Sequence, residues 1–327
     1  MLTEQQIVER RSRVGASDVA AIMGVPTFAG RNALTVYWEK IGALEENPAT
    51  DAMEAGNRLE PYILDWAERE LGPLERNVVV FDPAGAPIAS TLDGRVVADG
   101  TPVEAKTSGI FGPIHGQWGE AGTDEVPDGY IVQCQTQLLC TEAEVCRLFA
   151  LLGTRGRVEF TIHPEPRLIA TIRDVATDFY AEYVAKRRDP RDGWAERLEN
   201  AHGLRLTADP CAPALEVARR LKRIRGKVIR VENADPFIVW DKFRAVRLDA
   251  EKAEKTKLAE CLTILGDADA AELPGGVVFA YAEQRTADII DREAMKRDGV
   301  YEKYASGNTC RVPRLKGGEK RTSKKGA

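Results

Sequence analysis

The sequence has few residues of the kinds that bind zinc. It contains only three histidines and six cysteines among 327 residues, and no two cysteines are spaced as C-x-x-C. Zinc sites are built from such His and Cys groups, so none is expected. The cysteines are predicted to be small buried side chains of a protein in a reducing compartment. A divalent metal would have to be held by carboxylates, which favours magnesium or manganese.

Long apolar runs are also absent. No stretch of the sequence approaches the roughly 18 apolar residues that a membrane-spanning helix needs. The first residues, MLTEQQIVERRSR, are polar and lack the apolar core of a signal peptide. We therefore expect a cytoplasmic protein with no membrane partner. With 43% hydrophobic and 30% charged residues, the chain has the composition of an ordinary globular protein.

The charge of the chain is divided unevenly along its length. Residues 1–200 carry a net charge of −12 and residues 201–327 a net charge of +7, which together give the −5 of the whole chain. Such a division is typical of an acidic part that collects cations and a basic part that contacts polyanions, although two solvated surfaces would give the same counts. The end of the chain, RVPRLKGGEKRTSKKGA, is strongly basic and is expected to be partly disordered.

Hydrophobic periodicity predicts an α/β domain over residues 1–200. Runs typical of strands come in a series of three, followed by a helix, two more strands and a closing helix. This order predicts a mixed sheet flanked by helices. The expected helices are 3–11, 19–23, 32–42, 51–72, 130–142 and 167–188, and the expected strands are 77–81, 87–91, 101–107, 145–152 and 157–163.

A different organisation is expected beyond residue 200. Residues 201–212, AHGLRLTADPCA, have the composition of a linker. Two charged helical segments follow, broken by NADP at 233–236, and they predict an antiparallel helical hairpin. Short strands are expected in GGVVFAYAE and NTCRVPRL. The predicted domains are therefore 1–200, the linker 201–212, and a region at 213–327 with the hairpin, a small β element and the basic tail.

The expected strand 101–107 carries an acid and a base on one face. Glu104 and Lys106 are two positions apart, so a strand points both to the same side. Asp93 lies at a turn between two expected strands, whose pairing would bring it to the same edge. Glu60 and Gln133, on flanking helices, complete the candidates. A solvated strand edge explains any one of these residues. A metal site that hydrolyses phosphodiesters explains them together, because it needs converging oxygen ligands and a group that controls the attacking water.

Five motifs in order give residues 10 to 140 a resemblance to a known family, the YqaJ-type viral recombinases. Arg10-Arg11 with VGASDVAAIMG resembles the family's R-R-x-x-I-G-G-S-D-I-A-x-I-x-G opening. AGNRLEP is similar to its G-x-x-x-E helix, ASTLDG to its A-S-P-D-G, VEAKT to its V-E-I-K-T, and YIVQCQTQL to its Y-x-x-Q-x-Q helix. The family is related to the phage lambda exonuclease, within the P-D-(D/E)-x-K nucleases. The resemblance therefore implies a restriction-endonuclease-like fold.

The resemblance also implies a role for each matching residue. Asp93 and Glu104 would bind Mg²⁺, or Mn²⁺ in its place, with help from the backbone carbonyl of Ala105. Lys106 would polarise the attacking water and stabilise charge on the phosphate. Glu60 would bind or orient a second metal or its water, and Gln133 would position Lys106 or the water. Arg10 would contact the 5′-terminal phosphate, and Ser17 falls in the adjoining phosphate-contacting motif. Leu92 and Ala105 depart from the family's motifs, but neither position supplies a side-chain ligand.

These roles predict a metal-dependent DNA exonuclease, acting 5′ to 3′ on duplex ends, that produces 3′ single strands for phage-type recombination. The expected partners are double-stranded DNA ends, a single-strand annealing protein and, by analogy with the lambda enzyme, further copies of the chain in a trimer. A phage or prophage protein in a bacterial host cell is implied. Two alternatives stay open, namely an endonuclease or nickase on the same core and a non-catalytic DNA-binding module for recombination. The retained residues Glu60, Asp93, Glu104 and Lys106 argue against the second alternative.

Overall fold

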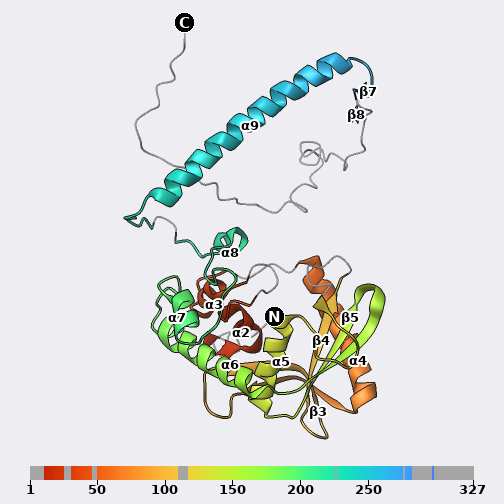
Figure 1. The fold of residues 1–327 in the computed structure, drawn as a ribbon, viewed down its shortest axis with the longest axis vertical. Helices are drawn as coiled ribbons and strands as arrows, with labels where there is room; N and C mark the ends of the chain where they lie inside the picture. Colours follow the sequence, from red (N-terminus) through yellow and green to blue (C-terminus); the bar gives the residue numbers. More distant parts are fainter. Residues whose placement is uncertain are drawn as a thin grey trace. The chain divides into compact units, whose positions relative to one another are not determined.

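The chain divides into two compact units, Met1–Gly226 and Lys227–Ala327, which are described separately (Figure 1). The computed structural model describes residues 11–25, 31–45, 50–109, 117–224, 227–274, 277–281 and 297. The helix expected at 3–11 therefore lies almost wholly outside the described residues, as do the strand expected in NTCRVPRL and the basic tail.

The described part of the first unit is built on a six-stranded mixed sheet. Its order is β1-β3-β4-β5-β6, and β2 pairs with β3 off this path. The β1–β3 and β4–β5 pairs are parallel and the other pairs are antiparallel. The predicted mixed sheet is confirmed, with β1 as a strand that the sequence pattern did not indicate. The strands are β1 Val14–Gly15, β2 Leu74–Phe81, β3 Ile88–Val96, β4 Pro102–Ser108, β5 Cys146–Leu152 and β6 Gly156–Ile162.

Helices flank this sheet, as the periodicity predicts. The helix α4 begins where the Thr50 side chain accepts a hydrogen bond from the Met53 N–H at 3.2 Å, and it ends at Gly72, whose φ of 91° favours glycine. The helix α6 continues into a π-helical turn over Tyr180–Val184. The helices are α2 Ala16–Ile22, α3 Ala33–Lys40, α4 Asp51–Leu71, α5 Asp128–Thr141, α6 Pro166–Phe179, α7 Trp194–Asn200 and α8 Leu215–Arg219.

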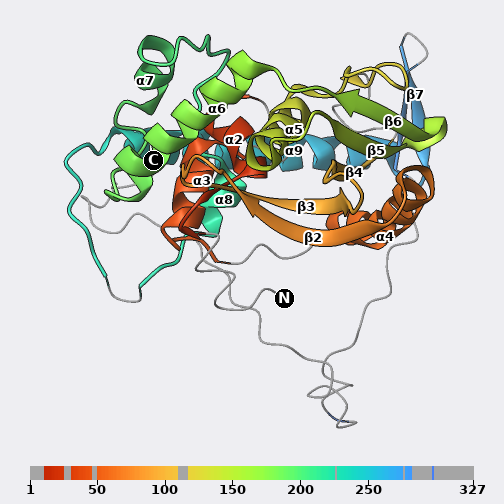
Figure 2. The ribbon, with the colours of Figure 1, turned by 90° about the horizontal axis from the view of Figure 1, so that it is seen from below.

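The helices α4 and α5 lie on opposite faces of β4 (Figure 2). Ile63 and Leu64 of α4 share a buried cluster with Val103 of β4. The neighbouring residue of the strand, Glu104, accepts a hydrogen bond from Gln133 of α5. Successive side chains of a strand point to opposite faces, so these contacts place one helix on each face. Glu104 and Lys106 of β4 thus face α5.

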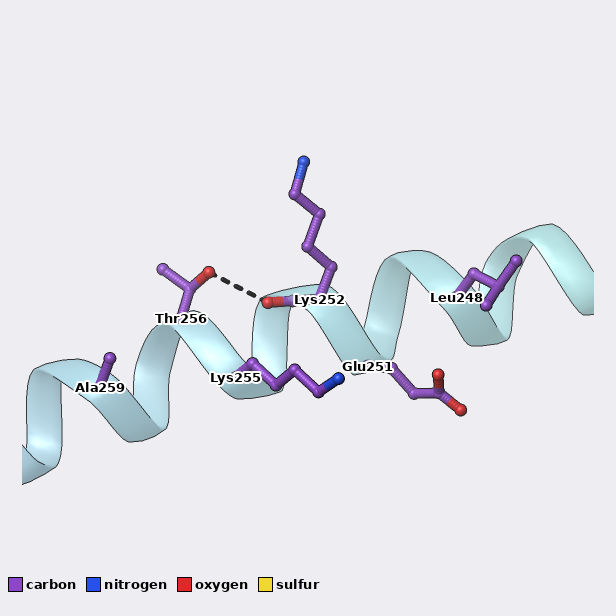
Figure 3. Close-up of a pocket in the computed structure, with 6 residues that line it drawn as sticks. All are labelled: Leu248, Glu251, Lys252, Lys255, Thr256 and Ala259. Carbon is purple, nitrogen blue, oxygen red and sulfur yellow. Dashed lines mark hydrogen bonds between the residues drawn. The ribbon is translucent and has the colours of Figure 1, made fainter. Parts of the chain in front are cut away.

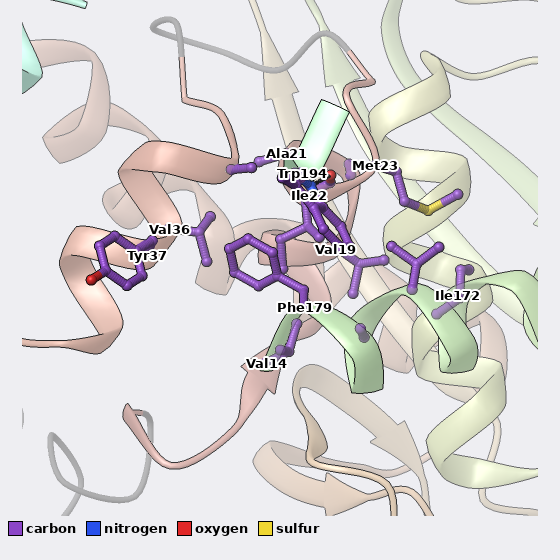
Figure 4. Packing of buried hydrophobic residues seen from close by; sticks show 14 of the residues in the cluster. Val14, Val19, Ala21, Ile22, Met23, Val36, Tyr37, Ile172, Phe179 and Trp194 are labelled. Carbon is purple, nitrogen blue, oxygen red and sulfur yellow. Dashed lines mark hydrogen bonds between the residues drawn. The ribbon is translucent and has the colours of Figure 1, made fainter. Parts of the chain in front are cut away.

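A large apolar cluster joins α2, α3 and α6 to the segment around α7 (Figure 4). Trp194 is fully buried within it and donates a hydrogen bond from Nε1 to the Ile22 carbonyl at 2.9 Å. The rings of Phe179 and Trp194 pack edge to face at 5.0 Å. Full burial of a side chain of this size stabilises the fold by about 2–3 kcal/mol. The cluster holds α2, which carries the GASD motif, firmly against the rest of the unit.

Residues 201–212, which were expected to be a linker, pack against the rest of the first unit. Cys211 is buried in the large apolar cluster, and Leu204 and Leu206 pack against it. The Asn32 side chain donates to the Ala212 carbonyl at 2.6 Å. Further along, a β-bridge joins Leu44 to Leu221. The first unit therefore extends well beyond residue 200 and includes the short helix α8.

The second unit contains one long helix in its described part. This helix, α9, spans Asp235–Leu265, and the two strands β7 Ala270–Leu273 and β8 Val277–Ala280 form an antiparallel pair after it. The predicted helical hairpin is wrong. In its expected first arm, residues 214–231, the described residues form one helix, α8, which is five residues long and belongs to the first unit. The short strand expected in GGVVFAYAE is confirmed as β8. No helix in the described ranges is both long and apolar enough to cross a membrane.

Candidate active site

Asp93 lies where β3 and β4 separate. The two strands pair only at Gly94–Val103 and Arg95–Pro102, and Asp93 is the next residue of β3 after the last pair. Its carboxylate oxygen Oδ2 accepts a hydrogen bond from the Ala105 N–H at 2.8 Å. A side chain thus provides the acceptor for a strand N–H at the point where the ladder ends. This bond fixes the Asp93 carboxylate beside the acidic and basic residues of β4.

Glu104 is a buried carboxylate whose oxygens are both hydrogen-bonded. Its side chain is 1% exposed. Oε1 accepts from Gln133 Nε2 at 2.6 Å and forms an ion pair with the Lys106 ammonium, and Oε2 accepts from Gln137 Nε2. A charged group at this depth is stable only when it is paired and hydrogen-bonded. The solvated-edge interpretation of Glu104 is therefore excluded.

Lys106 joins the charges of this site. Its Nζ lies 5.1 Å from the centroid of the Tyr130 ring, within range of a cation–π contact. Burial works to lower the pKa of Lys106, but the charges of Glu104 and Asp93 outweigh burial and raise this pKa above its ordinary value. Burial and the charge on Glu104 raise the pKa of Tyr130 to about 12, although Lys106 opposes the shift. Lys106 is a protonated cation at neutral pH, facing a neutral phenol.

The carboxyl of Asp93 has a pKa well above its usual range. Burial, followed by the charges of Glu104 and Glu60, raises the pKa of Asp93 to about 8, against the opposing effects of Lys106 and the Ala105 N–H. Two carboxylates in one poorly solvated place repel each other unless a cation lies near both. Lys106 alone does not neutralise the pair, so Asp93 and Glu104 form a site that favours additional positive charge.

Glu60 approaches this site from α4. Its charge contributes to the raised pKa of Asp93, although Glu60 is only half-buried. One turn earlier, a Cβ added to Gly56 would lie 3.7 Å from the Thr107 hydroxyl of β4. Residues four apart share a helix face, so Gly56 and Glu60 both face the end of β4. The structure therefore brings together Glu60, Asp93, Glu104, Ala105, Lys106 and Gln133, six of the residues singled out from the sequence.

The donors in this site suit a hard divalent cation. The carboxylates of Asp93 and Glu104 are oxygen ligands of the kind that Mg²⁺ and Mn²⁺ prefer, and strand β4 adds the backbone carbonyl of Ala105. Burial and the charge of Glu104 raise the pKa of Asp93, and a cation between the two carboxyls would favour the ionised form of both. Within the described ranges, no three His, Cys, Asp or Glu side chains are grouped so that they could hold a metal. Mg²⁺ suits such a site, because it keeps several of its waters.

Residues 8–144 match the family model of the YqaJ-like viral recombinase domain. The resemblance stated from the sequence is therefore confirmed. All six residues that converge on the site lie within the matched residues 8–144. A curated relative, the uncharacterized protein YqaJ of Bacillus subtilis, is 24% identical over 189 residues, which are 56% of this chain and 57% of that protein. The match thus spans little more than half the length of the relative.

Several solved structures are similar to part of this chain. The alkaline exonuclease LHK-Exo from Laribacter hongkongensis is 22% identical, with a TM-score of 0.43, over 60% of this chain and all of its own. Its complex with dAMP gives a TM-score of 0.45 over the same shares. A phage-related exonuclease from Haemophilus somnus 129PT is 15% identical over 54% of this chain and 96% of its own, with a TM-score of 0.41.

The helix α5 supplies two site residues that the sequence analysis did not assign. Tyr130, Gln133 and Gln137 follow each other at spacings of three and four, so they share one helix face. The ring of Tyr130 lies against Lys106, and Gln137 binds Glu104. The spacing of four from Gln133 was the available signal for Gln137. By contrast, the amide of Gln135 in the same motif bonds to the chain between β6 and α6.

The GASD motif holds a buried aspartate, Asp18, in an ion cluster and leaves Ser17 exposed. Asp18 forms ion pairs with Lys40, at 2.6 Å, and with Arg31. Burial works to raise the pKa of Asp18, but Lys40 and Arg31 outweigh it and hold this pKa well below its ordinary range. Ser17 is exposed on the first turn of α2, and its carbonyl accepts from Arg31 at 2.8 Å. Arg10, the other expected phosphate ligand, lies outside the described residues.

A surface hollow on α9 is not a second site. All six of its lining residues belong to this one helix, at positions that follow one face (Figure 3). No second element among the described residues encloses it. Its lining residues are Leu248, Glu251, Lys252, Lys255, Thr256 and Ala259.

Proposed function

We propose that this chain is a metal-dependent deoxyribonuclease with its catalytic centre at the end of β4. The observation that carries this proposal is the grouping of Lys106 with two poorly solvated carboxylates, Glu104 and Asp93, one of which has a pKa raised to about 8. This arrangement concentrates negative charge where a divalent cation can bind and keeps an ammonium beside it. The match to a viral recombinase domain supports DNA as the substrate.

In this proposal Asp93, Glu104 and the carbonyl of Ala105 would hold Mg²⁺ or Mn²⁺, and Glu60 would orient a second ion or its water. A divalent ion bound there would supply Lewis-acid activation of a water and charge stabilisation at the phosphate. The protein's own residues prepare the site. The Ala105 N–H fixes Asp93, and Gln133 fixes Glu104. These bonds form before substrate arrives, so little reorganisation is needed during the reaction.

Lys106 acts on the reacting groups in this mechanism. Its pKa is raised above the ordinary value, so it acts as a fixed positive charge and not as a base at neutral pH. An ammonium in a buried site stabilises charge that develops on the attacking water and on the phosphate oxygens. The ring of Tyr130 covers one side of this cation.

The mode of action that fits the YqaJ-like domain best is exonucleolytic digestion from duplex ends, 5′ to 3′. Arg10 and Ser17 would then bind the 5′-terminal phosphate. The 3′ single strands produced would pass to a single-strand annealing protein in recombination, and the chain would act as a homo-oligomer. The exposure of Ser17 on the first turn of α2 supports its access to a phosphate.

The test uses linear and closed-circular duplex DNA incubated with the purified protein and Mg²⁺, with and without a chelator. Loss of linear DNA alone supports the exonuclease, and loss of both forms indicates an endonuclease or nickase. A gel shift without loss indicates a binding module and contradicts the proposal. The variant Asp93→Asn serves as the inactive control. A preference for 5′-phosphorylated over 5′-hydroxyl ends that disappears in Arg10→Ala would support the polarity.

A further inference from the structure

Gln137 is a buried helical residue that bonds to side chains of two neighbouring strands. It lies on α5 and is completely buried. Its Nε2 donates to Oε2 of Glu104 on β4, and its Oε1 accepts from Sγ of Cys146 on β5 at 3.3 Å. Both ends of the amide are therefore satisfied inside the protein. The side chain connects the interior of the sheet with the acidic residue of the candidate active site.

The two partners determine which way the amide of Gln137 points. A carboxylate can only accept, so it requires the NH₂ end, and a thiol that donates requires the carbonyl end. Cys146 is buried, and its hydrogen bond with Cys134, followed by burial, raises the pKa of the Cys146 thiol well above its ordinary value. The thiol therefore keeps its proton. Reversing the amide would set a carbonyl against the carboxylate of Glu104.

Each oxygen of Glu104 has its own set of partners. Gln133 and Lys106 bind Oε1, and Gln137 binds Oε2. Without Gln137, the buried Oε2 would lose this donor, which costs about 1–3 kcal/mol or more for a charged group. The carboxylate would relieve this cost by rotating toward other donors. The orientation of Glu104 that the site presents thus depends on a residue that does not reach the substrate.

We propose that Gln137 is a positioning residue that holds Glu104 in the orientation for binding the divalent cation, and that Cys146 in turn holds Gln137. This inference rests on the proposed function, because it assigns Glu104 to a metal. Groups that orient metal ligands through hydrogen bonds commonly change metal affinity by about 10–100-fold when they are removed. Gln137 is expected to act on metal affinity in this range.

The chain contains a matched control on the same helix. Gln135 is 3% exposed, and its amide is also bonded at both ends. Its Nε2 donates to the His163 carbonyl at 2.7 Å, and its Oε1 accepts from the Glu165 N–H at 2.9 Å. Replacing either glutamine by methionine removes two hydrogen bonds from α5 at almost constant volume. Of these two glutamines, Gln137 is the one bonded to Glu104.

The experiment compares Gln137→Met with Gln135→Met in the full-length chain. Binding of Mn²⁺ alone is measured by calorimetry, the Mg²⁺ concentration that gives half-maximal nuclease activity is measured in parallel, and Tm is recorded. We expect Gln137→Met to weaken Mn²⁺ binding about tenfold or more and to raise the half-saturating Mg²⁺ by a similar factor. Saturating Mg²⁺ should recover most of kcat. Gln135→Met should lower Tm as much while leaving Mn²⁺ affinity unchanged.

A second pair of variants tests the link through the thiol, and serves if Gln137→Met does not fold. Cys146→Ser keeps a donor to the Gln137 carbonyl and should bind Mn²⁺ like the wild type. Cys146→Val removes this donor and should weaken binding. Equal Mn²⁺ affinity in wild type, Gln137→Met and Cys146→Val would overturn the inference but not the proposed function. A wild type that binds no Mn²⁺ would instead contradict the proposed metal site, and the inference with it.

Discussion

At the scale of single residues, three neighbouring groups stabilise the positive charge of Lys106. The ammonium forms an ion pair with Glu104, is attracted by the charge of Asp93 and lies over the ring of Tyr130. Its side chain is 20% exposed, so one part of it can still reach a ligand. A lysine that served only to neutralise Glu104 would need neither this exposure nor Asp93. The geometry fits a group that acts on a phosphate.

Replacing Lys106 by methionine should therefore abolish most cleavage and leave DNA binding intact. Glu104 keeps its bonds from Gln133 and Gln137, so the fold should survive the loss of the ammonium. Removing one electrostatic contact to the transition state commonly lowers the rate by about 10²–10³-fold. Single-turnover cleavage and a binding titration in Ca²⁺ measure the two effects. The exposed Lys186→Met is the control, and near-wild-type cleavage by Lys106→Met would remove Lys106 from the mechanism.

The candidate site could be predicted in part because a strand has a period of two. That period places Glu104 and Lys106 on one face, and the motif order adds Asp93, Glu60 and Gln133. What could not be predicted is the environment of these groups. The complete burial of Glu104 comes from the packing of α5 against β4, and no local pattern encodes it. Gln137 was missed although its spacing of four from Gln133 was a signal, because a helical glutamine is usually solvated.

At the scale of elements, β2 has a local distortion opposite the candidate site. Asn77 has a φ of 56°, in the left-handed region, and it lies between the paired residues Arg76 and Val78 without a pair of its own. The register places it opposite Asp93, since its neighbours pair with Gly94 and Leu92. Asp93 therefore lacks a regular partner on both sides, because its pairing with β4 also ends there. The distortion frees Asp93 from the regular geometry of the sheet.

We expect Asn77→Gly to keep or slightly raise stability and Asn77→Ala to lower it by about 1–2 kcal/mol, which is the cost of a left-handed conformation for an ordinary residue. If the alanine variant relaxes toward regular strand geometry, Asp93 should move and activity should fall further than stability alone explains. Urea unfolding and cleavage assays measure both. Equal stability of the two variants would show that the left-handed conformation at Asn77 contributes nothing.

The helices α2 and α3 are joined by the ion cluster around Asp18. Replacing Asp18 by asparagine removes the buried negative charge that pairs with Lys40 and Arg31, and breaking such a buried pair costs about 3–5 kcal/mol. Lys40 and Arg31 hold the pKa of Asp18 below its unfolded value. The ionised Asp18 therefore contributes its full share to the free energy of unfolding above about pH 3.9, the pKa of an aspartate in the unfolded chain. This share is lost as the pH falls below that value.

Urea unfolding of wild type and Asp18→Asn between pH 7 and pH 3 tests this. The difference in unfolding free energy should be constant from pH 7 to about pH 5 and should shrink toward pH 3. A variant as stable as the wild type at pH 7, but impaired in DNA binding, would instead assign Asp18 directly to a substrate contact. Asp178→Asn, in a cluster with Arg197 and His202 away from the GASD motif, is the comparison.

The fold was predictable where periodicity and length agreed. The five strands expected from the sequence of the first unit all occur, because each alternates or is bounded by turn residues. The two-residue β1 is too short to leave a pattern. The helical hairpin failed for a different reason. Its first arm, ALEVARRLKRIRGKVIRV, has helical composition, but Leu221 pairs with Leu44 as a β-bridge and the helix α8 ends at Arg219. Tertiary contacts override such weak local preferences.

At the scale of the whole molecule, the boundary between the units changes the meaning of the charge division. The first unit, residues 1–226, carries a net charge of −8, and the second, residues 227–327, carries +3. Part of the basic sequence beyond residue 200 therefore belongs to the unit with the candidate active site. There, Arg220 donates to the Glu45 carbonyl at 3.1 Å, which ties the basic segment to the start of the domain. Part of the positive charge that the proposed DNA binding would use thus lies in the first unit.

A chain truncated after Gly226 should fold, cleave DNA and bind it with a weaker dependence on salt. The cut leaves the buried Cys211 and Val217 in place, whereas a cut at Pro210 would remove both and should destabilise the unit. For every phosphate of duplex DNA that the shorter chain no longer neutralises, the slope of log K against log salt should flatten by about 0.9. The measurement is a binding titration at a series of salt concentrations for the full chain and for residues 1–226.

An unchanged slope would mean that residues 227–327 do not touch DNA. The exposed apolar side chains of α9, among them Phe243 and Val246, would then direct the search toward a protein partner or a second copy of the chain.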